Sequence, residues 1–126
     1  MKMDNHITKS QIDIKKRAYK YALEIIKLFE HLDKQDLTVR VISHQLLRSA
    51  TSVGANLVEG QASSSKKEFI NFLNHSLKSA NESKFWLALL RDSGKASKVK
   101  INDLLSETSQ LAKILASSIL TLKGKR

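Results

Sequence analysis

The sequence predicts an all-α fold, an antiparallel up-down-up-down four-helix bundle. Apolar residues recur at steps of three and four along four long segments, which is the spacing of one face of a helix. The 126 residues include no proline and only four glycines, so little interrupts these segments. The connections between them are short, and short connections make consecutive helices antiparallel. A chain of this length is expected to form one domain.

The first helix is expected over residues 11–33, after a flexible arm of residues 1–10. The arm is polar and unlike a signal peptide, and no apolar run in the chain is long enough to span a bilayer. We therefore expect a cytoplasmic protein with no membrane partner. The core stripe of this helix is Ile14, Ala18, Ala22, Ile25, Phe29 and Leu32. The outer face carries a basic cluster of Lys15, Lys16, Arg17 and Lys20.

The second helix is expected over residues 38–59, with Asp36 or Thr38 as its N-cap. Its apolar stripe is Val39, Ile42, Leu46, Ala50, Val53 and Leu57. The opposite face is polar and consists of Arg48, Ser52, Asn56 and Glu59. This polar strip is either solvated or makes specific contacts, for instance to another subunit. Gly60 is expected to end the helix in a left-handed conformation.

The third helix is expected to start at Ser65, which forms a capping box with Glu68, and to stop at residues 92–94. Its stripe is Phe69, Phe72, Leu73, Ser76, Ala80, Ser83, Leu87 and Leu90. The middle of this stripe is small, as is the second helix around Ala50, so we expect these two helices to pack closely. Near the end, Phe85, Trp86 and Leu89 surround the helix together with Leu90. A helix that is apolar all round is buried on several sides, which favours a homo-oligomer.

The fourth helix is expected over residues 101–122, after a basic connector at 95–100 that contains Lys95, Lys98 and Lys100. Its stripe is Leu104, Leu105, Thr108, Leu111, Leu115, Ile119 and Leu122. Residues 11–122 thus form the bundle. A basic C-terminal tail of residues 123–126 follows, with Lys123, Lys125 and Arg126.

The charge balance indicates an anionic partner. Lysine and arginine number 22 against 12 acidic residues, a formal net charge of +10. An excess of this size favours nucleic acid first and an anionic membrane surface second, although it also serves solubility. Candidate phosphate contacts are the four basic residues of the first helix, those of the connector and tail, and Lys66 and Lys67 at the start of the third helix.

Other chemistry finds little support in the residue pattern. The absence of cysteine excludes disulfides and cysteine-ligated zinc. None of the four histidines has a glutamate three residues before it, and the glycines are scattered, so neither a di-iron site nor a phosphate loop is indicated. We expect no metal, no cofactor, no small-molecule substrate and no enzymatic activity.

The stretch from the second to the third helix resembles a known family. The residues that carry the resemblance are 45–50, 52–60, 65–69, 72–73, 76–77 and 80–82, with Arg48-Ser49-Ala50, Asn56-x-x-Glu59-Gly60 and Glu82 as its core. The family is that of the four-helix-bundle proteins encoded in intervening sequences of bacterial 23S ribosomal RNA genes. The resemblance implies a bundle without catalytic activity. It also implies assembly into a ring, since a related accessory protein of diversity-generating retroelements looks like a homopentameric barrel that binds nucleic acid and a reverse transcriptase.

Two functions follow as hypotheses. The first is an oligomer, a pentamer by resemblance, that binds ribosomal or precursor RNA through phosphates. The second is a ring-shaped protein-interaction scaffold that docks another protein. In both, Arg48, Asn56, Glu59 and Glu82 are expected to be structural, holding the second helix to the third or one subunit to the next. Glu82 is either solvated or paired, with Arg48 or Asn56 as its candidate partner.

Overall fold

The computed structural model describes residues 9–125, with the side chains of residues 14–125. Within this part of the chain there are four helices and no strand: α1 (Lys9–His31), α2 (Leu37–Gln61), α3 (Lys66–Asp92) and α4 (Lys98–Leu122). The predicted all-α fold is confirmed. Because α1 begins at Lys9, the last two residues of the predicted arm are helical. The rest of that arm lies outside the described residues, as does Arg126.

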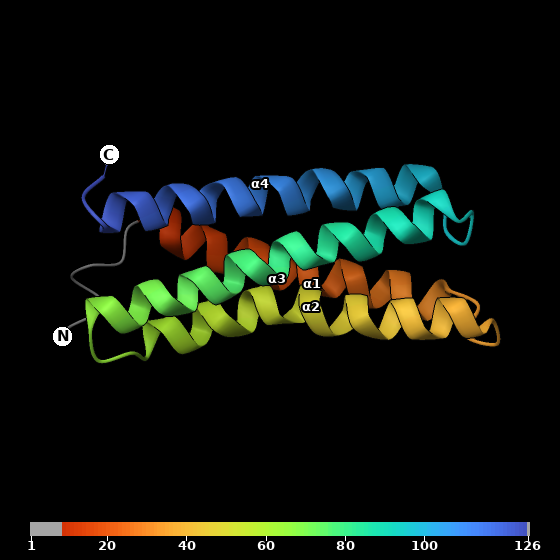
Figure 1. The fold of residues 1–126 in the computed structure, drawn as a ribbon, viewed down its shortest axis with the longest axis horizontal. Helices are drawn as coiled ribbons and strands as arrows, with labels where there is room; N and C mark the ends of the chain where they lie inside the picture. The colour runs from red at the N-terminus through yellow and green to blue at the C-terminus, as the bar shows by residue number, and fades with distance from the viewer. Residues whose placement is uncertain (1–8, 126) are drawn as a thin grey trace.

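The helices form a bundle in which consecutive helices run in opposite directions (Figure 1). α1 packs against α2 and α4, and α3 packs against the same two helices. The starts of α1 and α3 therefore lie at one end of the bundle together with the ends of α2 and α4. We call this the α1-start end, and it brings together segments far apart in the sequence.

Side-chain caps fix the starts of α2 and α3 where the sequence predicts them. The Asp36 carboxylate accepts a hydrogen bond from the Val39 backbone N–H at 3.1 Å. The Ser65 hydroxyl oxygen accepts one from the Glu68 backbone N–H, also at 3.1 Å. Each bond satisfies a donor that the first turn of a helix would otherwise leave unpaired.

The start of α4 differs from the prediction. The Ser97 hydroxyl oxygen accepts a hydrogen bond from the Lys100 backbone N–H at 3.4 Å, so the helix begins at Lys98. The prediction of a basic connector over residues 95–100 was therefore wrong in its second half. Lys98 and Lys100 are exposed residues of the first turn of α4.

Gly60 does not end α2. The helix continues to Gln61, and Ala62 caps it in a right-handed conformation, so the predicted left-handed cap at Gly60 was wrong. Gly60 is buried against α3, where an added Cβ would lie 3.1 Å from Phe72 Cβ and 3.2 Å from Phe69 Cδ1. Glycine at this position allows a close approach of two helices.

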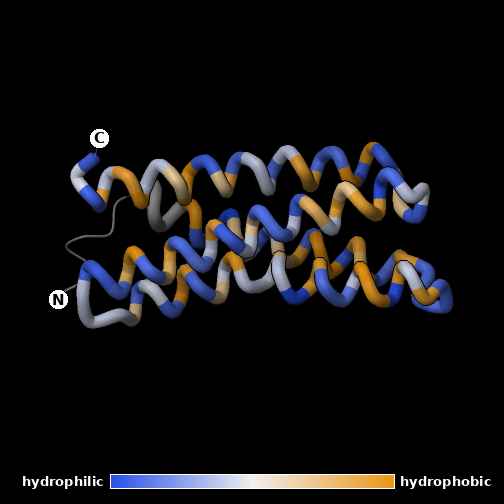
Figure 2. Tube along the Cα trace, viewed as in Figure 1, coloured by the Kyte–Doolittle hydropathy of each residue, from blue (hydrophilic) through white to orange (hydrophobic). Residues whose placement is uncertain are grey.

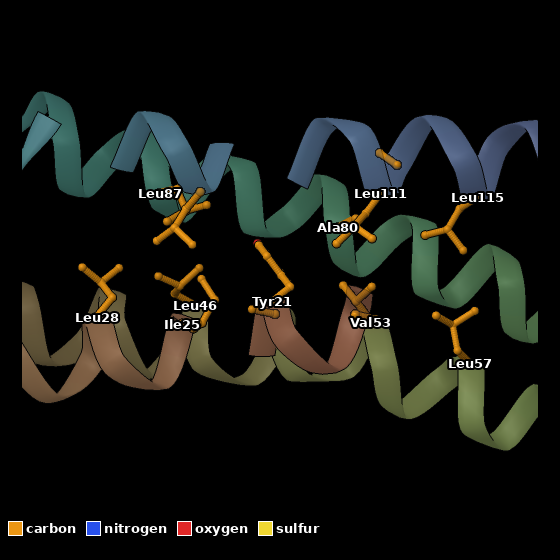
Figure 3. Packing of buried hydrophobic residues seen from close by; sticks show 14 of the residues in the cluster. Tyr21, Ile25, Leu28, Leu46, Val53, Leu57, Ala80, Leu87, Leu111 and Leu115 are labelled. Carbon is orange, nitrogen blue, oxygen red and sulfur yellow. The ribbon is translucent and has the colours of Figure 1, made fainter. Parts of the chain in front are cut away.

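Apolar side chains from all four helices fill the centre of the bundle, and apolar residues recur along each helix (Figures 2 and 3). Buried residues that the sequence predicts as core are Ile14, Ala18, Ile25, Leu32, Val39, Leu46, Ala50, Val53, Leu57, Phe69, Leu73, Ala80, Leu87, Leu90, Leu104, Leu111, Leu115 and Ile119. The stripe on α1 differs in part, since Tyr21 and Leu28 are buried whereas Ala22 and Phe29 are half-buried.

Small residues bring α2 and α3 close together, as predicted. The buried Ser76 hydroxyl on α3 donates to the Val53 carbonyl oxygen of α2 at 2.7 Å. Ser49 and Ser83 share a buried hydrogen bond of 2.9 Å between their hydroxyls. A side-chain bond to the backbone of a neighbouring helix is possible only where the two helices approach closely.

Buried hydroxyls form two pairs in the core, each between two helices. The Ser49–Ser83 pair joins α2 to α3, and in the second pair the Tyr21 hydroxyl of α1 lies 2.7 Å from Thr108 Oγ1 of α4. Figure 3 shows Tyr21 reaching into the middle of the bundle. None of the buried side-chain nitrogens and oxygens in the described residues lacks a hydrogen-bond partner. The two hydroxyl pairs are thus satisfied polar contacts inside an apolar core.

The contact between α1 and α4 is looser than that between α2 and α3. A hollow of about 320 Å³ lies along it, lined by Tyr21, Leu28 and Leu104 among others. Beside this hollow, Arg17 of α1 donates to both carboxylate oxygens of Glu107 of α4, at 2.5 and 3.1 Å. The ion pair, the bond from Arg17 to the Gln110 side-chain oxygen and the Tyr21–Thr108 bond are polar contacts between α1 and α4.

Candidate nucleic-acid interface

A basic hollow lies between the start of α3 and the end of α4. Figure 1 shows both of these segments at the α1-start end. The volume of the hollow is about 340 Å³, and its lining is Lys66, Lys67, Ile70, Asn71, Asn74 and Lys123. The three lysines are exposed, and none of these six described residues is acidic. We call this feature the end hollow.

The chemistry of the end hollow suits phosphate groups. Lysine ammonium groups and asparagine amides both donate hydrogen bonds to phosphate oxygens. The hollow lies beside the first turn of α3, where the backbone dipole also favours an anion. Glu68, an exposed residue of the same turn, is the nearby opposing charge. The asparagines were missed by the sequence prediction, although Lys67, Asn71 and Asn74 follow the i, i+4, i+7 spacing of one helix face.

The predicted basic cluster on α1 is divided in the structure. Arg17 faces α4, bound to Glu107 and, at 2.9 Å, to Gln110. The Glu107 carboxylate raises the pKa of Arg17. On the α2 side of α1, Lys15 donates to the Gln61 side-chain oxygen at 2.5 Å. Two members, Lys16 and Lys20, are exposed. Lys15 and Arg17 therefore lie on different sides of α1, each bound to a different neighbouring helix. That the four residues contact phosphates stays a prediction.

Two basic residues at the opposite end of the bundle, Lys95 and Arg91, have acidic partners. The Lys95 ammonium lies 2.7 Å from the Asp36 carboxylate and holds the pKa of that carboxyl below its usual range. Arg91 donates to Asp92 at 2.8 Å and lowers the pKa of Asp92 in the same way. These pairs reduce the positive potential of this end. The α1-start end is thus the stronger candidate, and Lys125 is an exposed cation beyond the end of α4.

The residues predicted to be structural lie on the outer surface of α2 and α3. Arg48 and Glu82 form an ion pair between the two helices, and Trp86 Nε1 donates to the same Glu82 oxygen at 2.8 Å. Asn56 donates within α2, to the Ser52 carbonyl oxygen at 2.8 Å. Glu59 is exposed. The pairing foreseen for Glu82 is therefore with Arg48, while the amide of Asn56 is used elsewhere.

The end of α3 retains apolar surface, as the all-round pattern predicts. Phe85 is 57% exposed, and its ring contacts the Trp86 ring edge-on at 5.0 Å between centroids. Trp86 and Leu89 are half-buried. In a single copy of the chain this surface is uncovered.

The stability of Arg48→Ala should report whether another subunit covers this surface. The side chains of the pair are 57% and 36% exposed within one copy. An exposed pair contributes up to about 1 kcal/mol, whereas removing one partner of a buried pair costs about 3–5 kcal/mol. We expect the larger loss if assembly buries the pair, measured by chemical denaturation at several protein concentrations. A loss near or below about 1 kcal/mol at every concentration would contradict an oligomeric role for Arg48.

The described residues provide no cluster of three or more histidine, aspartate or glutamate side chains suited to a metal ion. None of the helices in residues 9–125 combines the length and apolar character needed to cross a bilayer.

The chain matches the family of 23S rRNA-intervening sequence proteins over residues 10–117. It is also similar to the crystal structure of a protein with unknown function from the S23 ribosomal protein family of Bacteroides thetaiotaomicron VPI-5482. The two are 33% identical, with a TM-score of 0.82, and the similarity covers 87% of this chain and 97% of that one. No curated protein matches the chain. The relation to the retroelement accessory protein stays a prediction. Because the family match extends over most of the bundle, the chain belongs to the 23S rRNA-intervening sequence protein family.

Proposed function

We propose that this protein is a non-enzymatic, oligomeric bundle protein that binds ribosomal or precursor RNA by contacting the phosphates of the RNA. The observation that carries the proposal is the end hollow, where α3 and α4 bring Lys66, Lys67 and Lys123 together without an acidic lining residue. The net charge of +10 supports an anionic ligand of this kind. The family name is consistent with RNA but does not state what these proteins bind.

We further propose that several copies act together, with five as the number that the resemblance implies. One end hollow presents three lysines, which is few for a stable complex with RNA at physiological salt. A ring would repeat the hollow around its axis, so that weak contacts add up through avidity. The uncovered apolar surface around Phe85 supports assembly, because such surfaces often mark protein contacts.

Charge reversal at the end hollow tests the proposal. The double variant Lys66→Glu/Lys67→Glu is compared with Lys78→Glu/Lys113→Glu, which reverses two exposed lysines elsewhere and changes the net charge equally. RNA affinity is measured at several salt concentrations by filter binding or anisotropy. Each phosphate-binding lysine contributes about one to the slope of log K against log salt, so the first variant should reduce that slope by about two. The control variant should leave it unchanged.

The same measurement separates the alternatives. Equal losses in both variants would mean that net charge, not the end hollow, attracts RNA. If the unaltered protein binds no RNA at low salt, the proposal of an RNA-binding protein is wrong, and the scaffold hypothesis takes its place.

A further inference from the structure

A second hollow, unrelated to the end hollow, lies between the outer sides of α1 and α2. Its volume is about 480 Å³. Small residues form its floor: Ala18 and Ala22 from α1, and Gly54 and Ala55 from α2. Tyr19 and Val58 form its walls and are 68% and 59% exposed. We call it the α1–α2 groove.

The groove exists because the two helices approach closely where both carry small residues. An added Cβ on Gly54 would lie 3.5 Å from Ala18 Cβ, so the helices are already at ordinary contact distance there. Leu23 and Ile26 of α1, both exposed, follow Tyr19 at helical spacing and extend the same outer face. α1 is therefore apolar on its core side and also on this outer side. An exposed apolar groove of this kind marks a binding surface.

The groove has a basic rim. Lys15, Lys16 and Lys20 line it along α1, and none of its described lining residues is acidic. The rim lysines favour an occupant with negative charge, and the apolar floor and walls favour one with apolar side chains. A helix with apolar residues on one face and acidic residues beside them is complementary to both features.

We propose that the α1–α2 groove binds an acidic amphipathic helix of a partner protein. A second copy docked groove to groove would place its rim lysines against those of the first, which like charges oppose, and a copy docked through another face is an outcome of the test below. RNA bases need hydrogen-bond partners at their edges, and the Thr51 hydroxyl of the groove already donates to the Leu47 carbonyl oxygen at 2.7 Å. The groove thus suits apolar anchors better than bases. This inference goes beyond the proposed RNA binding and assigns the rim lysines to a different ligand.

The test uses two synthetic peptides and the 126-residue protein. One peptide is a helix former of about 18 residues with leucines along one face and glutamates elsewhere, long enough to be helical when bound. The other has the same leucines with lysine in place of glutamate. Fluorescence anisotropy measures the binding of each. We expect saturable binding of the glutamate peptide and none of the lysine peptide.

Matched variants locate the contact. Val58→Asp alters a groove wall, while Val41→Asp alters a valine of the same helix that is 54% exposed and outside the groove. Lys16→Glu/Lys20→Glu reverses the rim, with Lys78→Glu/Lys113→Glu as its control. We expect each groove variant to weaken peptide binding by about tenfold or more, and each control to leave it within about twofold. Circular dichroism verifies that all variants fold.

Four results would overturn the proposal. Equal effects of Val58→Asp and Val41→Asp, or equal binding of the two peptides, would show that the groove is not recognised. A smaller particle mass for Val58→Asp in light scattering would show that a second copy covers the groove. Loss of RNA binding in Val58→Asp would make the groove an RNA site. Since the end hollow is tested with its own lysine variants, each proposal can fail without the other.

Discussion

Truncating Tyr21 to alanine is expected to lower the free energy of unfolding by about 3–5 kcal/mol, as the loss of a fully buried aromatic side chain does. Tyr21 lies in the middle of the core and is 2% exposed. Its removal leaves a cavity among the four helices and takes a hydrogen-bond partner from Thr108. Urea denaturation followed by circular dichroism measures the loss. A change below about 1 kcal/mol would show that the core repacks or that water replaces the hydroxyl.

Tyr21→Phe is the matched control, because it keeps the ring and removes only the hydroxyl. We expect a smaller loss of about 1–3 kcal/mol, which is the cost of leaving buried partners unpaired.

The stability of the protein at alkaline pH should also differ between the unaltered protein and Tyr21→Phe. Burial raises the pKa of Tyr21 to about 12, against the opposing effect of the Thr108 and Ser83 hydroxyls. The unfolded chain releases this proton near pH 10, so the stabilisation is complete below about pH 10 and is lost as the pH rises through about 12. Tyr21→Phe should lack this part of the alkaline loss.

RNA affinity is expected to fall about a thousandfold between about 50 and 200 mM salt, if an assembled oligomer contacts about six phosphates. Three lysines line each end hollow, so two copies on one RNA strand supply contacts of that number. Each contact releases a counterion from the RNA, and added salt opposes that release. A salt titration with structured RNA measures the slope. An RNA affinity that does not change with salt concentration would contradict phosphate binding and favour the protein-scaffold hypothesis.

Periodicity and caps were sufficient to predict the helices and most of the core. The Ser65–Glu68 pair marks the start of α3 because the cap uses residues that are close in sequence. Ser97 was not predicted as a cap because several of the residues after it are basic, and a basic run of this kind is also typical of an exposed loop. Gly60 was misassigned because glycine near a helix end is most often a cap, and its contact with Phe69 depends on a different helix.

The sites are formed by residues from different helices. The pattern within one helix does not show which residues of another helix lie beside them. Tyr21 was not predicted as core because the stripe was placed through Ala22, and the partner of its hydroxyl, Thr108, is 87 residues away. The end hollow requires that the end of α4 lie beside the start of α3. The groove requires small residues on α2 next to Tyr19. Arg48 was one of two candidate partners for Glu82, because helical phase places it and Asn56 on the same face, and only the structure selects Arg48.

The contact between α1 and α4 is looser than that between α2 and α3, and this difference should decide which helix separates most easily. Local opening costs least where little surface is buried, and the hollow between α1 and α4 marks such a place. Separation of α1 from α4 breaks the Arg17–Glu107 pair and the Tyr21–Thr108 bond, whereas separation of α2 from α3 would expose Gly60 and the buried serines. Backbone amides of α1 should therefore exchange with deuterated solvent through sub-global unfolding. Those of α2 and α3 should exchange only when the whole chain unfolds. We therefore expect α1 to be the first helix to separate from the bundle.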